Sequence, residues 1–160
     1  MSETSKARSN ILHRLFVFGT DELASRPGKQ FAHWISITNP GASNPRLPGF
    51  AGKTLHLQFG DVFSEADARR CQKRPPCLTD IREGIGFFRE AWVLKESKIL
   101  ISCDYGASRS PGLAYVCIAD QLGDEVFDRR GALTQPLKEF YTKLNQEILL
   151  IGRSKPILPP

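Results

Sequence analysis

The sequence has no long apolar run, and it contains only four cysteines and three histidines. No stretch reaches the roughly 18 consecutive apolar residues that a membrane helix needs. Residues 1–10 are polar and lack the apolar core of a secretory signal peptide. We therefore expect a soluble, cytoplasmic protein. Its 160 residues suffice for one domain, which we assign to 11–151, with a flexible tail at 1–10 and a proline-rich tail at 152–160.

The cysteines are scattered along the chain, and without an export signal we expect them to be reduced. Cys71 and Cys77 leave two interpretations open, a redox pair or half of a metal site. No further cysteine or histidine stands at the spacing of zinc ligands, so we predict an ordinary surface loop here and a protein that needs no metal or cofactor. Cys117 falls in an apolar stretch, as a small core residue does.

Positive charge exceeds negative charge by five, with 22 Lys and Arg against 17 Asp and Glu. This excess favours anionic partners, but it lacks the dense clustering of a nucleic-acid-binding surface. We expect neither nucleic acid nor membrane as a partner. A local basic cluster lies at Arg69, Arg70, Lys73 and Arg74. It is either a solvated loop or a surface that reaches acidic residues on a partner.

Short apolar stretches predict the strands of a sheet. Residues 11–18, 34–38 and 54–59 are apolar or alternate between apolar and polar residues. The segment 39–52 is rich in Pro, Gly and Asn and predicts a long loop. Residues 99–102 form a nearly continuous apolar run, which is typical of a central parallel strand buried on both faces.

Helices are predicted between and after these strands. From Asp80, with Glu83 as its capping-box partner, apolar residues recur on one helical face. A second apolar helix is expected over 111–122, with its proline at the N1 position. A short polar helix over 124–130 and an amphipathic helix from Pro136 follow. The alternation predicts a three-layer αβα domain of the α/β class, with a central, mostly parallel sheet of four or five strands.

The strongest functional signal lies between the strand at 99–102 and the helix that follows. The chain there reads Cys103-Asp-Tyr-Gly106-Ala-Ser-Arg109-Ser110. A turn between a strand and a helix places backbone N–H groups around one point at the positive end of the helix. This arrangement suits a tetrahedral dianion such as phosphate. The residues whose backbone would surround the phosphate are Asp104, Tyr105, Gly106, Ala107, Ser108 and Arg109.

The side chains of this loop suggest individual roles. The field of the helix N-terminus favours the thiolate of Cys103, which is the nucleophilic form. The fork of Arg109 can grip two phosphate oxygens and hold phosphorus in line with the sulfur. Gly106 lets the backbone turn without a side chain in the phosphate site. Ser110 can hydrogen-bond the sulfur, both as thiolate and as leaving group.

This loop resembles that of the protein tyrosine phosphatase superfamily, Cys-x-x-Gly-x-x-Arg-Ser/Thr, most closely in its small, dual-specificity-like members. Looser similarity runs from about Trp34 to Leu149. The resemblance implies a metal-free phosphomonoesterase that acts on a phosphorylated protein or a small phosphomonoester through a phosphocysteine intermediate. The sequence departs from the family at Ser102, where a His that supports the loop and the thiolate usually stands.

Cleavage of a P–O bond requires a proton for the leaving oxygen. Asp61 is the first candidate for this acid, since it follows a strand, precedes a long loop and matches the Asp at the equivalent strand end of the resembled family. Asp80 is the second candidate, although a capping role already explains it. Asp104 is expected to point away from the phosphate site, and its charge favours a substrate with a single phosphate.

Two other functions are compatible with the same loop. A phosphate-binding module that has lost turnover would keep the loop and Arg109 but lack a working acid. Rhodanese-like sulfur chemistry, or arsenate chemistry, also places a cysteine loop between a strand and a helix. The combination of Gly106 with Arg109 and Ser110 fits phosphate better than either of these.

Overall fold

The computed structural model describes residues 13–61, 65–106 and 108–123. The strands are β1 (Leu15–Gly19), β2 (His33–Thr38), β3 (Lys53–Gln58) and β4 (Ile99–Cys103). The helical elements are α2 (Thr20–Leu23), η1 (Gly28–Gln30), α3 (Glu65–Cys71), α4 (Leu78–Val93) and α5 (Arg109–Gln121). No helix in these ranges is both long and apolar enough to span a membrane. The two predicted tails and the helices predicted over 124–130 and from Pro136 lie outside the described residues.

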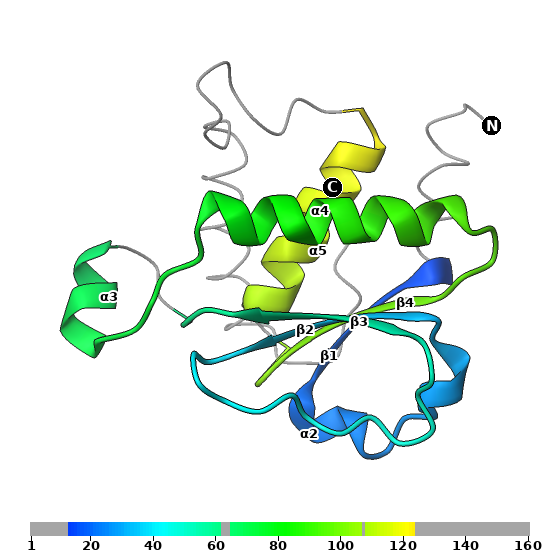
Figure 1. Cartoon of the computed structure of the whole chain (residues 1–160), viewed down its shortest axis with the longest axis horizontal. Helices are drawn as coiled ribbons and strands as arrows, with labels where there is room; N and C mark the ends of the chain where they lie inside the picture. The colour runs from blue at the N-terminus through cyan, green and yellow to red at the C-terminus, as the bar shows by residue number, and fades with distance from the viewer. Residues whose placement is uncertain (1–12, 62–64, 107, 124–160) are drawn as a thin grey trace.

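The four strands form one parallel sheet in the order β1-β4-β2-β3. The inner strand β4 is buried along its whole length, as its continuous apolar sequence predicted. Helices α4 and α5 cover one face of the sheet, and α2 lies on the other face (Figure 1). The prediction of a three-layer α/β domain with a parallel sheet is therefore confirmed.

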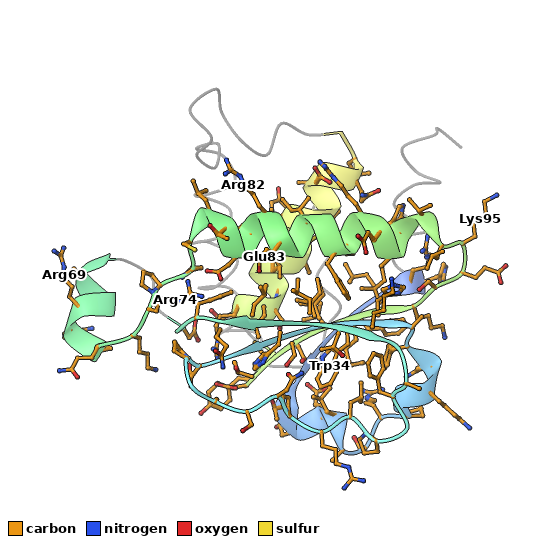
Figure 2. All side chains as sticks on the ribbon, viewed as in Figure 1. Trp34, Arg69, Arg74, Arg82, Glu83 and Lys95 are labelled. Atoms are coloured by element: carbon orange, nitrogen blue, oxygen red, sulfur yellow. The ribbon has the colours of Figure 1, made fainter. Side chains whose placement is uncertain are left out.

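Alternation along the strands separates the core into two parts. Ile35 and Ile101 pack on the side of α4 and α5, whereas Trp34 and Leu100 pack with Leu23 of α2. Figure 2 shows Trp34 on this second side of the sheet. Because successive side chains of a strand point to opposite faces, the last two residues of β4 also face opposite sides. The thiol of the strand's final residue lies on the α4 and α5 side.

Two helices begin earlier than the sequence predicted. Helix α4 begins at Leu78 and has Cys77 as its N-cap, so Asp80 is its third residue rather than its cap. Helix α5 begins at Arg109 instead of Pro111. A proline is tolerated as the third residue because the first backbone N–H groups of a helix have no intrahelical acceptor.

Part of the predicted surface loop is helical. Residues Glu65–Cys71 form α3, which lies beyond the end of the sheet in Figure 1. Both Cys71 and Cys77 are free and exposed. The chain then returns to the sheet, where the backbone N–H of Gly60 donates to the carbonyl oxygen of Arg74 at 2.6 Å. The prediction missed α3 because this charged segment has no apolar periodicity.

Candidate active site

The Cys103 loop lies at the carboxyl end of the parallel sheet. Thr20, directly after β1, donates its backbone N–H to the carbonyl oxygen of Asp104 at 3.0 Å and its hydroxyl to that of Cys103 at 3.4 Å. Asn39 follows β2, and Phe59 follows β3. Because all strands run the same way, their carboxyl ends meet at one edge of the sheet, where α/β proteins bind ligands.

Gly106 allows the loop to pack directly on the end of β1. Its φ of +65° is a conformation that favours glycine. A Cβ at this position would lie 2.5 Å from the backbone nitrogen of Gly19 and 2.8 Å from the carbonyl carbon of Phe18. The turn therefore requires glycine for both its backbone conformation and its closeness to β1.

The thiol of Cys103 lies next to the hydroxyl of Ser110 in the first turn of α5. Their Sγ and Oγ atoms are 3.1 Å apart, and both residues are buried. At this distance the hydroxyl can donate a hydrogen bond to a thiolate. The side chains expected to be nucleophile and thiolate stabiliser are thus in contact, while Ala107 of the same loop lies outside the described residues.

Arg109 is buried, with 3% of its surface exposed, and three residues hold its guanidinium. Nη1 donates to the carbonyl oxygen of Phe59 at 2.9 Å and to Oδ1 of Asn39 at 3.2 Å. Nη2 donates to Oδ2 of Asp104 at 2.6 Å. Nε is buried and has no hydrogen-bond partner among the described residues. A buried N–H without an acceptor is costly, so Arg109 retains a donor for an anion.

Sequence reasoning did not identify Asn39 and Phe59 as partners of Arg109. Asn39 was assigned to the start of the long loop, and Phe59 contributes only its backbone carbonyl. A usable signal for Asn39 existed, since a polar residue at the carboxyl end of a parallel strand lies where ligands bind. The carbonyl of Phe59 carries no signal in the sequence.

Asp104, which we expect to point away from the phosphate site, bonds to the guanidinium of Arg109. Its Oδ2 atom accepts hydrogen bonds from Nη2 of Arg109 at 2.6 Å and from Nδ2 of Asn39 at 3.2 Å. The buried guanidinium explains this orientation, because a charge removed from water needs a partner. Arg109, Asp104 and Asn39 thus form a closed hydrogen-bonded network at the edge of the loop.

Asp61 reaches the loop from a position 47 residues before its partner Ser108. The Ser108 hydroxyl donates to Oδ1 of Asp61 at 2.6 Å. Ser108 is the N-cap residue of α5, yet its side chain makes no capping hydrogen bond. Its hydroxyl holds the candidate acid instead of the helix end, so the structure brings Asp61 together with the loop.

Asp80 is engaged elsewhere. Its two carboxylate oxygens accept hydrogen bonds from Arg74 at 2.8 Å each, and Oδ2 also accepts one from the backbone N–H of Cys77 at 2.8 Å. Arg74 lies in the segment that joins α3 and α4 (Figure 2). Burial alone raises the pKa of Asp80, but the hydrogen bonds from Arg74 and Cys77 outweigh it and lower that pKa. Asp80 is therefore a poor proton donor, and its hydrogen bonds stabilise the first turn of α4.

Comparison with solved structures shows which fold this is. The human tyrosine phosphatase-like serine/threonine/tyrosine-interacting protein superposes with a TM-score of 0.56 at 18% identity, covering 88% of this chain and 94% of that chain. Tk-PTP in its active form gives 0.53 at 16% identity, with 86% and 94% covered. OH1 of the Orf virus, a tyrosine phosphatase, gives 0.50 at 13% identity, with 88% and 72% covered. The chain has the fold of the tyrosine phosphatases, as the resemblance of its loop predicted.

Comparisons of sequence alone give no match. Neither a scan against models of protein families nor a search of curated proteins finds a similar sequence. The likeness therefore lies in the arrangement of helices and strands, and the chemistry has to be argued from the residues of this chain.

Proposed function

We propose that this protein is a cysteine-dependent phosphomonoesterase, a protein tyrosine or dual-specificity phosphatase that works through a phosphocysteine intermediate. The observation that carries the proposal is the buried Nε of Arg109, which has no partner in the part of the chain that the structure describes, on the same loop as the contact of Cys103 with Ser110. An anion-binding donor and a hydroxyl-supported thiol on one loop are the elements of phosphoryl transfer to sulfur. The tyrosine phosphatase fold agrees with it.

In the first step, the thiolate of Cys103 attacks phosphorus opposite the leaving oxygen. The S–P bond forms, the P–O bond to the substrate breaks, and the leaving oxygen takes a proton from the carboxylic acid of Asp61. Arg109 neutralises charge on the phosphoryl oxygens, for which its Nε is available. The products are an alcohol or phenol and a phosphoryl group on Cys103.

In the second step, the carboxylate of Asp61 removes a proton from water as the water oxygen attacks phosphorus. The S–P bond breaks, inorganic phosphate forms, and Cys103 leaves as a thiolate. The hydroxyl of Ser110, 3.1 Å from the sulfur, stabilises this leaving group. The cycle returns the original thiolate and needs no metal or cofactor. It requires a reduced cysteine, which fits the cytoplasmic location that we propose.

The choice of Asp61 as the acid rests on two contacts. Asp61 is bonded to Ser108 of the loop, whereas Asp80 is bound on both oxygens by Arg74. A catalytic acid must be within reach of the leaving oxygen. Only the first of these carboxylates adjoins the Cys103 loop through a described contact.

The test is hydrolysis of an aryl phosphate, with vanadate as inhibitor. The wild type should release phosphate, and Cys103→Ser should lose turnover but still bind phosphate. Asp61→Asn should slow turnover by about 10²- to 10⁴-fold, the usual worth of a general acid. Cys71→Ser, which removes an exposed thiol outside the loop, is the matched control and should keep full activity. Full activity of Cys103→Ser would overturn the proposal.

A phosphate-binding module without turnover is the second candidate. The observation that favours it is Ser102, which stands where the resembled family has a His that supports the thiolate: its hydroxyl accepts the indole N–H of Trp34, on the far side of the sheet from the thiol. The same assay separates the two functions. Phosphate binding by the wild type without release of product from any aryl or alkyl phosphate would identify the binding module.

A further inference from the structure

A carboxylate of the same loop bonds to a nitrogen of Arg109 that a phosphate could also use. A guanidinium can hold two oxygens of one phosphate through Nε and Nη2. Nε has no partner among the described residues, but Nη2 donates to Asp104 at 2.6 Å. Asp104 therefore already bonds to one of the two nitrogens that a phosphate would use.

Two contacts besides that of Asp104 hold the guanidinium of Arg109. The Nη1 atom is held from two other directions, by the carbonyl oxygen of Phe59 at 2.9 Å and by Oδ1 of Asn39 at 3.2 Å. These contacts come from the ends of β3 and β2, which belong to the rigid sheet. Removal of the Asp104 charge should leave the guanidinium in place.

The exposure of the two partners differs strongly. The Arg109 side chain is 3% exposed, whereas that of Asp104 is 35% exposed. The carboxylate therefore reaches water, whereas the arginine stays buried, and a bound phosphate would supply the negative charge that the arginine needs. An incoming phosphate meets this carboxylate beside the donor that it requires.

We infer that Asp104 is a specificity-determining residue that weakens the binding of oxyanions at the Cys103 loop and selects substrates with one phosphate over polyanionic ones. This inference rests on the proposed function. Like charges repel in proportion to the charge that each carries. A ligand with several phosphates therefore loses more affinity to the Asp104 carboxylate than a single phosphate does.

The experiment measures binding of inorganic phosphate and of pyrophosphate by calorimetry, with every variant carrying Cys103→Ser. Asp104→Asn keeps the size of the side chain and an oxygen for Arg109 but removes the charge. We expect it to tighten phosphate binding by about 5- to 30-fold at low salt and to tighten pyrophosphate binding more. Asp104→Ala should do the same. Asp120→Asn is the control. It removes a carboxylate near the end of α5, about 16 Å along the helix from Arg109, and should leave both affinities unchanged.

Two results would overturn the role of Asp104. Unchanged or weaker phosphate binding in Asp104→Asn would show that the carboxylate supports Arg109, and an equal gain for both anions would show that it does not discriminate. Hydrolysis of an aryl phosphate by the wild type and by Asp104→Asn, both with Cys103 intact, distinguishes failure of this inference from failure of the proposed function. If they hydrolyse it and Asp104→Asn does not lower KM, only the inference about Asp104 fails; if neither chain hydrolyses it or binds phosphate, both fail.

Discussion

Ser108 and Asp61 are joined by a 2.6 Å hydrogen bond between the loop and the segment after β3. The bond fixes a carboxylate at the edge of the Cys103 loop. It also uses the hydroxyl that would ordinarily cap α5. Because Ser108 bonds to Asp61 and not to the end of the helix, its loss should affect substrates with poor leaving groups more than substrates with good ones.

Ser108→Ala should impair proton donation selectively. Without the hydrogen bond, Asp61 is less well oriented toward the leaving oxygen. We expect kcat/KM for phenyl phosphate, a poor leaving group, to fall about 10-fold, and kcat/KM for p-nitrophenyl phosphate to change little, since kcat/KM reports only the first step, in which the leaving oxygen takes its proton. Ser25→Ala, at an exposed position after α2, is the control. An equal loss for both substrates would show that Ser108 does not act through Asp61.

Gly106→Ala should disrupt the loop. The substitution places a Cβ 2.5 Å from a backbone atom of β1 and forces a positive φ on a residue with a side chain. We expect the free energy of unfolding to fall by more than about 2 kcal/mol and phosphate affinity to fall with it. Urea unfolding and phosphate titration measure the two effects. Gly86→Ala, at a site where the new Cβ meets nothing within 4 Å, should not destabilise the protein; similar effects in both variants would contradict this account of the loop.

The ion pair of Asp80 with Arg74 predicts a pH dependence of stability. The pKa of Asp80 is lowered in the folded protein. The stabilising contribution of Asp80 is therefore present above the pKa of the unfolded chain, about 4. It is lost as pH falls through the lower pKa of the folded protein. Asp80→Asn should therefore destabilise the protein by about 1–2 kcal/mol at pH 7. At pH 3 this difference should be smaller than at pH 7.

The measurement for Asp80 is urea unfolding at both pH values. Glu83→Gln removes an exposed carboxylate from the same helix and should differ little from the wild type at either pH. A difference between wild type and Asp80→Asn that persists undiminished at pH 3 would show that the ion pair is not its source.

Ser102 has a structural partner on the far side of the sheet from the thiol. The indole N–H of Trp34 donates to Oγ of Ser102 at 2.8 Å, and both residues are buried. Ser102→Ala leaves that N–H without an acceptor and should cost about 1–3 kcal/mol in urea unfolding. Combining it with Trp34→Phe should cost less than the sum of the two single changes; strict additivity would show that the bond contributes nothing.

The sequence predicted those parts of the fold whose pattern is local. The apolar run of β4 and the residues of the loop that follows were sufficient to predict a strand, a turn and a helix in that order. The start of α5 was placed at Pro111 because proline favours N1, but the buried Arg109 begins the helix. Tertiary contacts of Arg109 outweigh the local preference, and no local pattern contains them.

The partners of the site residues were less predictable. Asp61 was selected from its place after a strand, yet its bond to Ser108 joins segments far apart in the sequence. The ion pair of Asp104 with Arg109 was missed, because the direction of a side chain in a tight loop depends on the neighbouring strands. The sequence therefore identifies the carboxylates near the site but does not predict the direction of their side chains.

Detection of a phosphoryl group on Cys103 during turnover tests the proposed phosphocysteine intermediate itself. The protein is mixed with ³²P-labelled aryl phosphate, quenched rapidly in denaturant and mapped by peptide. Ser110→Ala should raise the yield, because loss of the hydroxyl 3.1 Å from the sulfur slows release of the thiolate in the second step. A phosphocysteine intermediate places label on the Cys103 peptide and on no other. Phosphate release without label on that peptide in either protein would contradict it.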